Sequence, residues 1–235
     1  MRARNPYLIG STLDTRQAPC VPKNPKKNLS ISSHRYFSAY ARYFGRYVDA
    51  YAGEGIKIGT VMPQNEFNSA QPFPSCCWSA EGLARFIPYL GAEMSKRGVD
   101  VLFGTLERGD AHLLEPTMAS PNAARWIKGV GVQWAGKGAL EDIKRRWPEL
   151  PIWGSEQECG VGTNDWHYAR YGWTTMMRYF AAGARVWDYW NLALTDGGSS
   201  GWGWPQNSLI VVEPAPKVVE QYQHVVIHAV LREME

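Results

Sequence analysis

The chain has 235 residues, of which 45% are hydrophobic and 20% charged, and its formal net charge is +3 at pH 7. This length and apolar content suit a domain with a sizeable core and exclude a disordered chain. The 25 basic and 22 acidic residues are interspersed, so nucleic acid is not an expected partner, and no apolar run is long enough for a membrane span. Eleven Trp and twelve Tyr residues are many for this length, and their rings suit both a packed core and stacking on sugars.

The N-terminal region shows no targeting signal. Residues 1–5 are basic, but the apolar stretch that follows, Pro6–Ile9, is too short for the core of a signal peptide. Residues 13–34 are rich in Pro, Lys, Asn and Ser, which predicts an irregular loop. After this loop, aromatic and apolar residues recur every three or four positions from Tyr36 to Tyr51, and this period predicts an amphipathic helix that ends near Gly53.

Strands and helices are predicted to alternate along the rest of the chain. Four strand and helix pairs are expected at Ile56–Met62 with Ala80–Lys96, Val99–Gly104 with Asn122–Ile127, Val130–Trp134 with Ala139–Trp147, and Pro151–Ser155 with Asp165–Ala182. A further strand, Arg185–Trp190, precedes a closing helix at Lys217–Arg232, and an earlier strand is expected at Tyr7–Ser11. Such alternation indicates a parallel sheet, here with six strands.

Two glutamates follow short apolar runs. Glu66 comes after Ile56–Met62, and Glu156 comes after Leu150–Trp153. The C-terminal ends of the strands in a parallel α/β barrel open onto one face, where glutamates far apart in sequence can converge. Cleavage of a glycosidic bond needs two such groups. We therefore expect a glycosidase, with no cofactor and no metal, because the cysteines lack zinc-like spacing; Cys20, Cys76, Cys77 and Cys159 leave the disulfide state open.

The residues around both glutamates resemble glycoside hydrolase family 30, the family of glucosylceramidases, β-1,6-glucanases and related β-glycosidases. The resemblance runs from about residue 36 to residue 212 and rests on these motifs, in the family's order: Gln64-Asn65-Glu66, Phe73-Pro74-Ser75-Cys76, Gln133-Trp134, Ser155-Glu156, Tyr189-Trp190-Asn191 and Gly201-Trp202-Gly203-Trp204. It implies a (β/α)8 TIM barrel. The strands predicted here correspond to about strands three to eight, so we expect residues 1–235 to form a single, N-terminally truncated barrel domain without the family's β-sandwich side domain.

The resemblance also implies catalytic roles. Glu66 corresponds to the acid/base and Glu156 to the nucleophile of a retaining mechanism that cleaves β-glucosides, β-1,6-glucan or glucosylceramide-like substrates. A partly dry pocket would favour the acid form of Glu66, and retention implies carboxyls about 5–5.5 Å apart. Glu158 is a rival nucleophile, because strand residues two apart point to the same side; the motif favours Glu156, which directly follows Ser155.

Five further residues are implied to bind the sugar. Asn65 resembles the asparagine that hydrogen-bonds the sugar 2-hydroxyl, a bond that can strengthen in the transition state. Gln133 and Trp134 resemble the pair that lines the family's sugar subsite, although core packing is the alternative for a tryptophan. Trp190 resembles the stacking platform, and Asn191 follows it on the loop after the last strand. The expected partner is an oligosaccharide or glycoside.

A second class of protein fits the same sequence. A non-catalytic remnant of such a barrel would bind carbohydrate through Trp134 and Trp190 but would be inactive because the first strands are missing. Removal of Glu156 would leave the affinity of this remnant largely intact, whereas an enzyme would lose its turnover. The sugar, the linkage, endo or exo action and the oligomeric state are left open. Related bacterial enzymes are exported, which suggests a secreted or periplasmic location although no signal peptide is visible.

Overall fold

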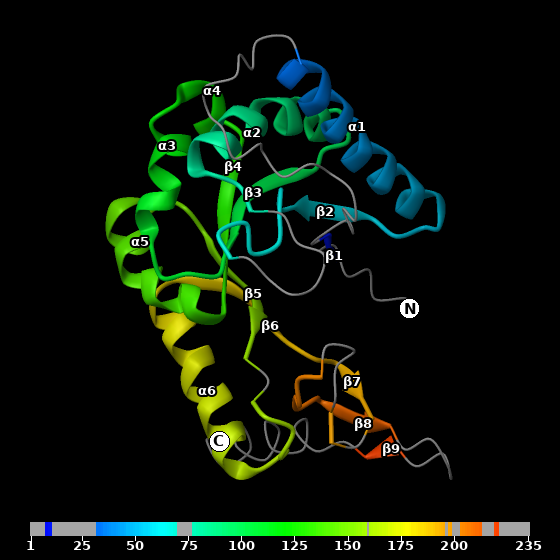
Figure 1. Ribbon diagram of the computed structural model, residues 1–235, viewed down its shortest axis with the longest axis vertical. Coiled ribbons are helices and arrows are strands. Elements are labelled where there is room, and N and C mark those ends of the chain that lie inside the picture. The colour runs from blue at the N-terminus through cyan, green and yellow to red at the C-terminus, as the bar shows by residue number, and fades with distance from the viewer. Residues whose placement is uncertain are drawn as a thin grey trace. The chain divides into compact units, whose positions relative to one another are not determined.

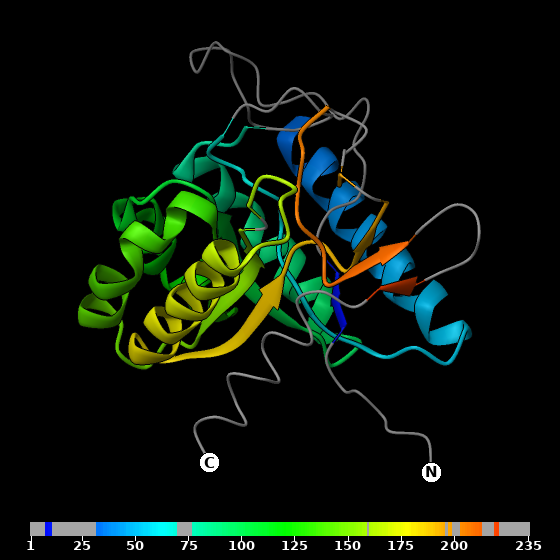
Figure 2. The same ribbon diagram turned by 90° about the horizontal axis from the view of Figure 1, so that it is seen from below.

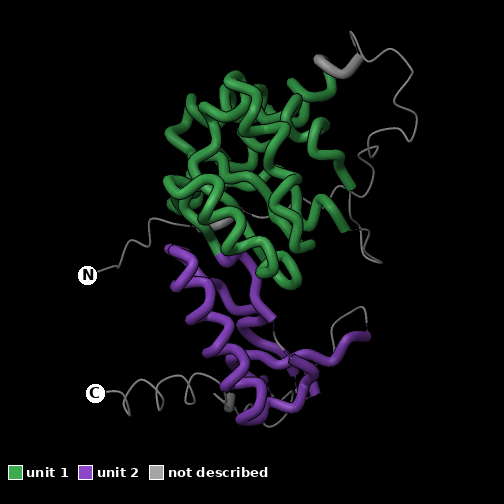
Figure 3. Tube along the Cα trace, turned by 90° about the vertical axis from the view of Figure 1, so that its left-hand side faces the viewer, with its two compact units in different colours: residues 1–153 green, residues 154–235 purple. Residues whose placement is uncertain are grey.

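The computed structural model describes residues 8–10, 32–69, 77–158, 160–195, 197–198, 203–212 and 219–220 (Figure 1). The chain divides into two compact units, residues 1–153 and residues 154–235, which are coloured separately in Figure 3. Strands and helices alternate through most of both units, as predicted from the sequence.

Six strands form the main sheet, and they hydrogen-bond to one another in chain order. They are β1 (Leu8–Gly10), β2 (Ile58–Val61), β3 (Asp100–Leu106), β4 (Ile127–Gln133), β5 (Ile152–Gln157) and β6 (Ala184–Tyr189). The pairs from β1 to β4 are parallel. Sequential parallel strands joined by helices are the arrangement of an α/β barrel. The sheet confirms the predicted fold class, an incomplete TIM barrel, and all six strands were expected near these positions.

Strands β3 and β4 form the centre of the first unit. Every residue of β3 after Asp100 is buried, as is every residue of β4 except Lys128, which is typical of parallel strands covered on both faces. Two glycines allow a close approach: a Cβ on Gly104, whose φ is +129°, would lie 2.6 Å from the carbonyl oxygen of Gly131. This tight packing fixes the C-terminal ends of β3 and β4 relative to each other.

Two long helices pack together in the first unit, α1 (Ser32–Gly53) and α2 (Ala80–Ser95) (Figures 1 and 2). Helix α2 begins after Ser79, whose Oγ accepts a hydrogen bond from the amide of Gly82 at 3.0 Å, and such caps satisfy otherwise unpaired amides. The aromatic face of α1 predicted from the sequence packs on α2, where the rings of Tyr40 and Phe86 stack at 5.0 Å.

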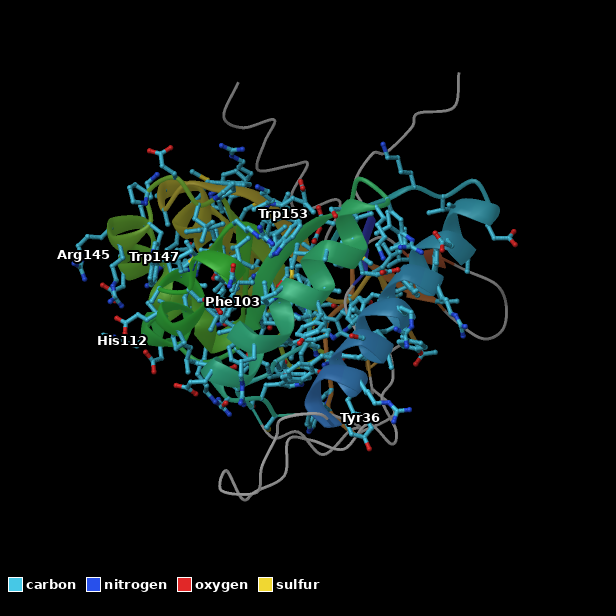
Figure 4. All side chains as sticks on the ribbon, turned by 90° about the horizontal axis from the view of Figure 1, so that it is seen from above. Tyr36, Phe103, His112, Arg145, Trp147 and Trp153 are labelled. Carbon is cyan, nitrogen blue, oxygen red and sulfur yellow. The ribbon has the colours of Figure 1, made fainter. Side chains whose placement is uncertain are left out.

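Short helices fill the connections on either side of β4. They are η1 (Ala111–Leu114), α3 (Glu115–Met118), α4 (Pro121–Ala124), η2 (Trp134–Ala139) and α5 (Leu140–Arg146). The predicted helix Asn122–Ile127 is wrong in its C-terminal half, because α4 ends at Ala124 and β4 already starts at Ile127. Figure 4 shows His112 and Arg145 of this region at the periphery, whereas Phe103 of β3 lies among densely packed side chains.

The second unit contains the end of β5, helix α6 (Trp166–Ala181), β6 and a small sheet. Asp165 caps α6 by accepting a hydrogen bond from the amide of Tyr168 at 3.0 Å. The small sheet pairs β7 (Ala193–Leu194) with β8 (Ile210–Val212) in parallel, and β8 with β9 (Val219–Glu220) antiparallel.

Two predictions are corrected at their edges. The expected closing helix Lys217–Arg232 is contradicted at Val219 and Glu220, which pair with β8, and its other residues lie outside the described ranges. The loop predicted at 13–34 also lies outside them up to residue 31, and α1 already begins at Ser32.

Candidate active site

Glu66 lies on a turn that follows β2 and is held against the end of β3. The amide of Gln64 donates to the carbonyl of Gly104 at 3.3 Å, and the amide of Thr105 donates to the carbonyl of Gln64 at 2.7 Å. The amide of Glu66 donates to Thr105 Oγ1 at 2.8 Å. Glu66 has a φ of +47°, in the left-handed region, and is only 5% exposed. A non-glycine residue keeps this conformation only where its surroundings hold it.

One amide group joins Glu66 to its neighbour Asn65. Gln133, at the end of β4, donates from Nε2 to Glu66 Oε1 at 3.2 Å and to Asn65 Oδ1 at 3.1 Å. Thr105 Oγ1 donates to the same Asn65 oxygen at 3.3 Å. Among the described residues Asn65 Nδ2 has no hydrogen-bond partner. Asn65 therefore has its acceptor occupied by two protein donors and retains a donor for another molecule.

Trp134 directly follows Gln133 at the start of η2. Its φ is +48°, and its side chain is partly buried. Lys137 Nζ donates to the carbonyl of Trp134 at 3.3 Å, which closes this first turn of η2. Asn65, Glu66, Gln133 and Trp134 thus lie beyond or at the C-terminal ends of β2 and β4, the two strands on either side of β3, and three of the four are joined by hydrogen bonds.

Glu156 lies near the end of β5 in the second unit, where the regular alternation of the strand is interrupted. A Cβ on Gly154 would point at Trp187 and Tyr179, and Gln157, three residues later, hydrogen-bonds Tyr179 of α6. Residues three apart on the same side of a strand break its two-residue period. The irregularity lies at Ser155 and Glu156, both of which are partly exposed.

Glu158, the rival carboxylate, has a partner on α6. Its Oε2 accepts a hydrogen bond from the hydroxyl of Tyr171. Glu158 also lies beyond the last residue of β5, Gln157, so the expectation that Glu156 and Glu158 share one strand face does not apply.

Trp190 and Asn191 follow β6 and have different surroundings. Trp190 is 44% exposed, whereas Asn191 is 9% exposed. Asn191 Nδ2 donates to Gln206 Oε1 at 2.8 Å, and the backbones of Asn191 and Leu209 are also hydrogen-bonded. The structure therefore places Asn191 in the framework of the loop, whereas Trp190 is exposed.

Two residues of these surroundings could not be found from the sequence. Thr105 contacts the Glu66 turn across 39 residues of sequence, and Tyr171 is one of several tyrosines on α6. A threonine in a strand and a tyrosine on a helix carry no local signal of such contacts. Among the described residues no three His, Cys, Asp or Glu side chains form a set of metal ligands. In the same part of the chain, no helix combines the length and apolar character that a membrane crossing requires.

The sequential α/β sheet, with a buried carboxyl and amide side chains at its strand ends, is the architecture of barrel glycoside hydrolases. The family model described as Glycosyl hydrolase family 30 TIM-barrel domain matches residues 25–229. The chain therefore belongs to glycosyl hydrolase family 30, which confirms the resemblance seen in its motifs.

Individual relatives agree with this assignment. The chain is 28% identical to lysosomal acid glucosylceramidase of Mus musculus over 192 residues, which are 71% of this chain and 36% of the relative. It is 28% identical over 146 residues to putative glucosylceramidase 1 of Caenorhabditis elegans, covering 56% of this chain and 28% of that protein. The endo-β1,6-glucanase BT3312 shares the fold with a TM-score of 0.72 at 17% identity, covering 83% of this chain and 48% of the other. The chain thus spans about a third of the length of these curated relatives.

Proposed function

We propose that this chain carries the catalytic carboxyls of a retaining β-glycosidase, with Glu66 as the acid/base and Glu156 as the nucleophile. The main support is the setting of Glu66, a nearly buried carboxyl beyond a barrel strand that accepts a hydrogen bond from Gln133. Its neighbour Asn65 holds a donor that no described residue uses. A carboxyl fixed in this way, next to a polar group suited to a sugar hydroxyl, fits the requirements of glycoside cleavage.

The proposed reaction has two steps. In the first, a Glu156 carboxylate oxygen forms a bond to the anomeric carbon while the bond to the leaving oxygen breaks, and the proton of Glu66 moves to that oxygen. In the second, water attacks the anomeric carbon, Glu66 takes a proton from the water, and the Glu156 carboxylate leaves. The product has the anomeric configuration of the substrate because the centre is inverted twice.

The remaining residues are assigned to sugar binding. Asn65 Nδ2 is proposed to hydrogen-bond the sugar 2-hydroxyl, since the two donors on Asn65 Oδ1 orient the amide. Gln133 is proposed to hold the Glu66 carboxyl in place. Trp134, which follows Gln133, is proposed to line the sugar subsite, and Trp190, which is exposed, is proposed to stack on a sugar ring. Asn191 is proposed to act through Gln206, by shaping the loop after β6.

The proposed substrates are β-glucosides, as oligosaccharides or as glycolipids, acted on by a single catalytic domain. Glucosylceramidase names among the relatives and the endo-β1,6-glucanase among the similar structures support this class. Aryl β-glycosides test for β-glycoside hydrolysis whether the natural substrate is a glycan or a glycolipid, because they carry only the glycone and a good leaving group.

The test measures nitrophenol release from a panel of aryl β-glycosides by the wild-type chain and by Glu66→Ala, Glu156→Ala and Glu158→Ala, each shown to unfold cooperatively. We expect one glycone to be hydrolysed, and loss of Glu156 to reduce kcat by a factor on the order of thousands. Glu158→Ala is the matched control and should keep most of the activity.

Azide separates the two roles. With an activated aryl glycoside, azide should restore turnover to both glutamate variants, giving a glycosyl azide of retained configuration from Glu66→Ala and of inverted configuration from Glu156→Ala. A folded chain that binds oligosaccharide without turnover, with unchanged affinity after Glu156→Ala, would establish the binding remnant instead. Loss of activity in Glu158→Ala but not in Glu156→Ala would reassign the nucleophile.

A further inference from the structure

We propose that Glu107 and Arg108, which directly follow β3, are positioning residues that hold the turn 64–69 and thereby the carboxyl of Glu66. The catalytic part of this inference rests on the proposed role of Glu66. The structural claim, that the two residues hold the turn in place, rests only on contacts within the first unit.

The far end of the turn is attached to these two residues. The amide of Glu107 donates to Asn68 Oδ1 at 3.2 Å, and Arg108 Nη2 donates to Ser69 Oγ at 3.0 Å. Both bonds join residues 39 positions apart in the sequence. The strand β3 therefore contacts the turn before and at Glu66, and the two residues that follow β3 contact it beyond Glu66.

Arg108 is itself oriented by Glu107. Its Nη1 donates to Glu107 Oε1 at 3.1 Å, and its Nε lies 2.9 Å from Glu107 Oε2. The Glu107 side chain is 10% exposed and that of Arg108 is 58% exposed. One hydrogen bond and one ion-pair contact hold the guanidinium group beside the Glu107 carboxylate, although Oε2 of that carboxylate has no hydrogen-bond partner among the described residues. A nearly buried glutamate thus keeps an otherwise accessible arginine near Ser69.

The turn needs an attachment at each end. Its near end is fixed by the backbone bonds between Gln64 and β3 and by the bond from the Glu66 amide to Thr105. Between the two ends Glu66 occupies the left-handed region, which persists only where neighbouring contacts impose it. If the far end is released, Glu66 can return to a relaxed conformation, and its carboxyl then loses its alignment with Gln133.

Hydrogen exchange of backbone amides tests whether Glu107 and Arg108 hold the turn, and it requires no catalytic activity. In Arg108→Ala we expect the amides of Glu66 and Ser69 to exchange on the order of tenfold faster, the factor for loss of one hydrogen bond to a charged group. The Ser69 amide reports on the turn because it donates to the carbonyl of Glu66 at 2.9 Å. Arg145→Ala, which removes another exposed ion-paired arginine of the same unit, should leave the turn unchanged. Unaltered exchange at the turn in Arg108→Ala overturns the proposal.

Kinetics test the catalytic consequence. Arg108→Ala should lower kcat while KM stays nearly constant, Glu107→Gln should act in the same direction, and added guanidinium ion should restore part of the activity to Arg108→Ala but none to Glu66→Ala. A raised KM with unchanged kcat would show that Arg108 binds substrate and overturns its positioning role. If the wild-type chain hydrolyses no glycoside, the proposed function fails. The hydrogen-exchange experiment still decides whether Glu107 and Arg108 hold the turn.

Discussion

Gln133 donates a hydrogen bond of 3.2 Å to the Glu66 carboxylate, although 67 residues of sequence separate the two side chains. The bond joins the end of β4 to the turn after β2, with β3 between them in the sheet. Both side chains are almost completely buried. This single contact thus fixes the proposed acid/base relative to two strand ends.

Replacement of Gln133 by Leu should lower kcat/KM by about five- to a hundredfold, because removal of one partner of a buried hydrogen bond costs about 1–3 kcal/mol. The measurement is steady-state hydrolysis of the best aryl glycoside. Thr117→Val is the control, since Thr117 is buried in the same unit and its hydroxyl has no hydrogen-bond partner among the described residues. Equal losses in both variants would mean that Gln133 acts only through general stability.

The sequence predicted the strands well because their signal is local. Apolar runs between helical patterns located all six strands of the sheet. As the sequence indicated, Glu66 lies beyond β2 and Glu156 lies near the end of β5. Boundaries were less accurate where the pattern is interrupted. The exposed Lys128 breaks the apolar run of β4, so its predicted start was three residues late.

Contacts between distant residues could not be predicted in the same way. Thr105 and Arg108 reach the Glu66 turn only because β3 lies beside β2, a consequence of the assembled sheet. The interruption of β5 at Ser155 and Glu156 depends on packing of Gly154 and Gln157 against α6. Hydrophobic periodicity predicts which face of a helix or strand is buried, but it does not predict which polar atoms of other elements will contact that helix or strand.

The bond between Tyr171 and Glu158 should stabilise the second unit by about 1 kcal/mol. A double-mutant cycle with Tyr171→Phe and Glu158→Ala, followed by urea unfolding, isolates this coupling from other effects of each change. Tyr168→Phe serves as the control, because no described residue hydrogen-bonds its hydroxyl. Additive effects of the two substitutions would contradict the bond.

Asp188 should give the protein a stability that falls as the pH rises. Trp187 and Tyr189 line a small cavity against α6, so Asp188 lies on the opposite face of β6. Burial raises its pKa from 3.8 to about 6. Between about pH 4 and pH 6 the folded chain keeps a proton that the unfolded chain releases, so this group lowers the free energy of unfolding progressively across the window.

Asp188→Asn should remove that contribution. Urea midpoints at intervals from pH 4 to pH 7 should show the variant gaining stability relative to wild type as the pH rises, with a constant difference above the window. Asp165 provides a control of opposite sign. Hydrogen bonding to the amide of Tyr168 holds the pKa of its carboxyl below the usual value, so its contribution is lost only as the pH falls through that lowered pKa. A pH-independent difference between wild type and Asp188→Asn would refute the assignment.

Two glycines in helices should respond in opposite ways to alanine. A Cβ on Gly91 of α2 would lie 2.3 Å from the Trp126 ring, whereas a Cβ on Gly172 of α6 would meet no atom within 4 Å. Gly91→Ala should therefore cost about 1–3 kcal/mol of the free energy of unfolding through overpacking. Gly172→Ala should add roughly 1 kcal/mol, because alanine favours the helix more than glycine does. Chemical denaturation measures both changes, and in a Trp126→Leu background the cost of Gly91→Ala should shrink, since the ring that blocks the methyl group is gone. An undiminished cost in that background would place the strain in the α2 backbone and not at the contact with Trp126.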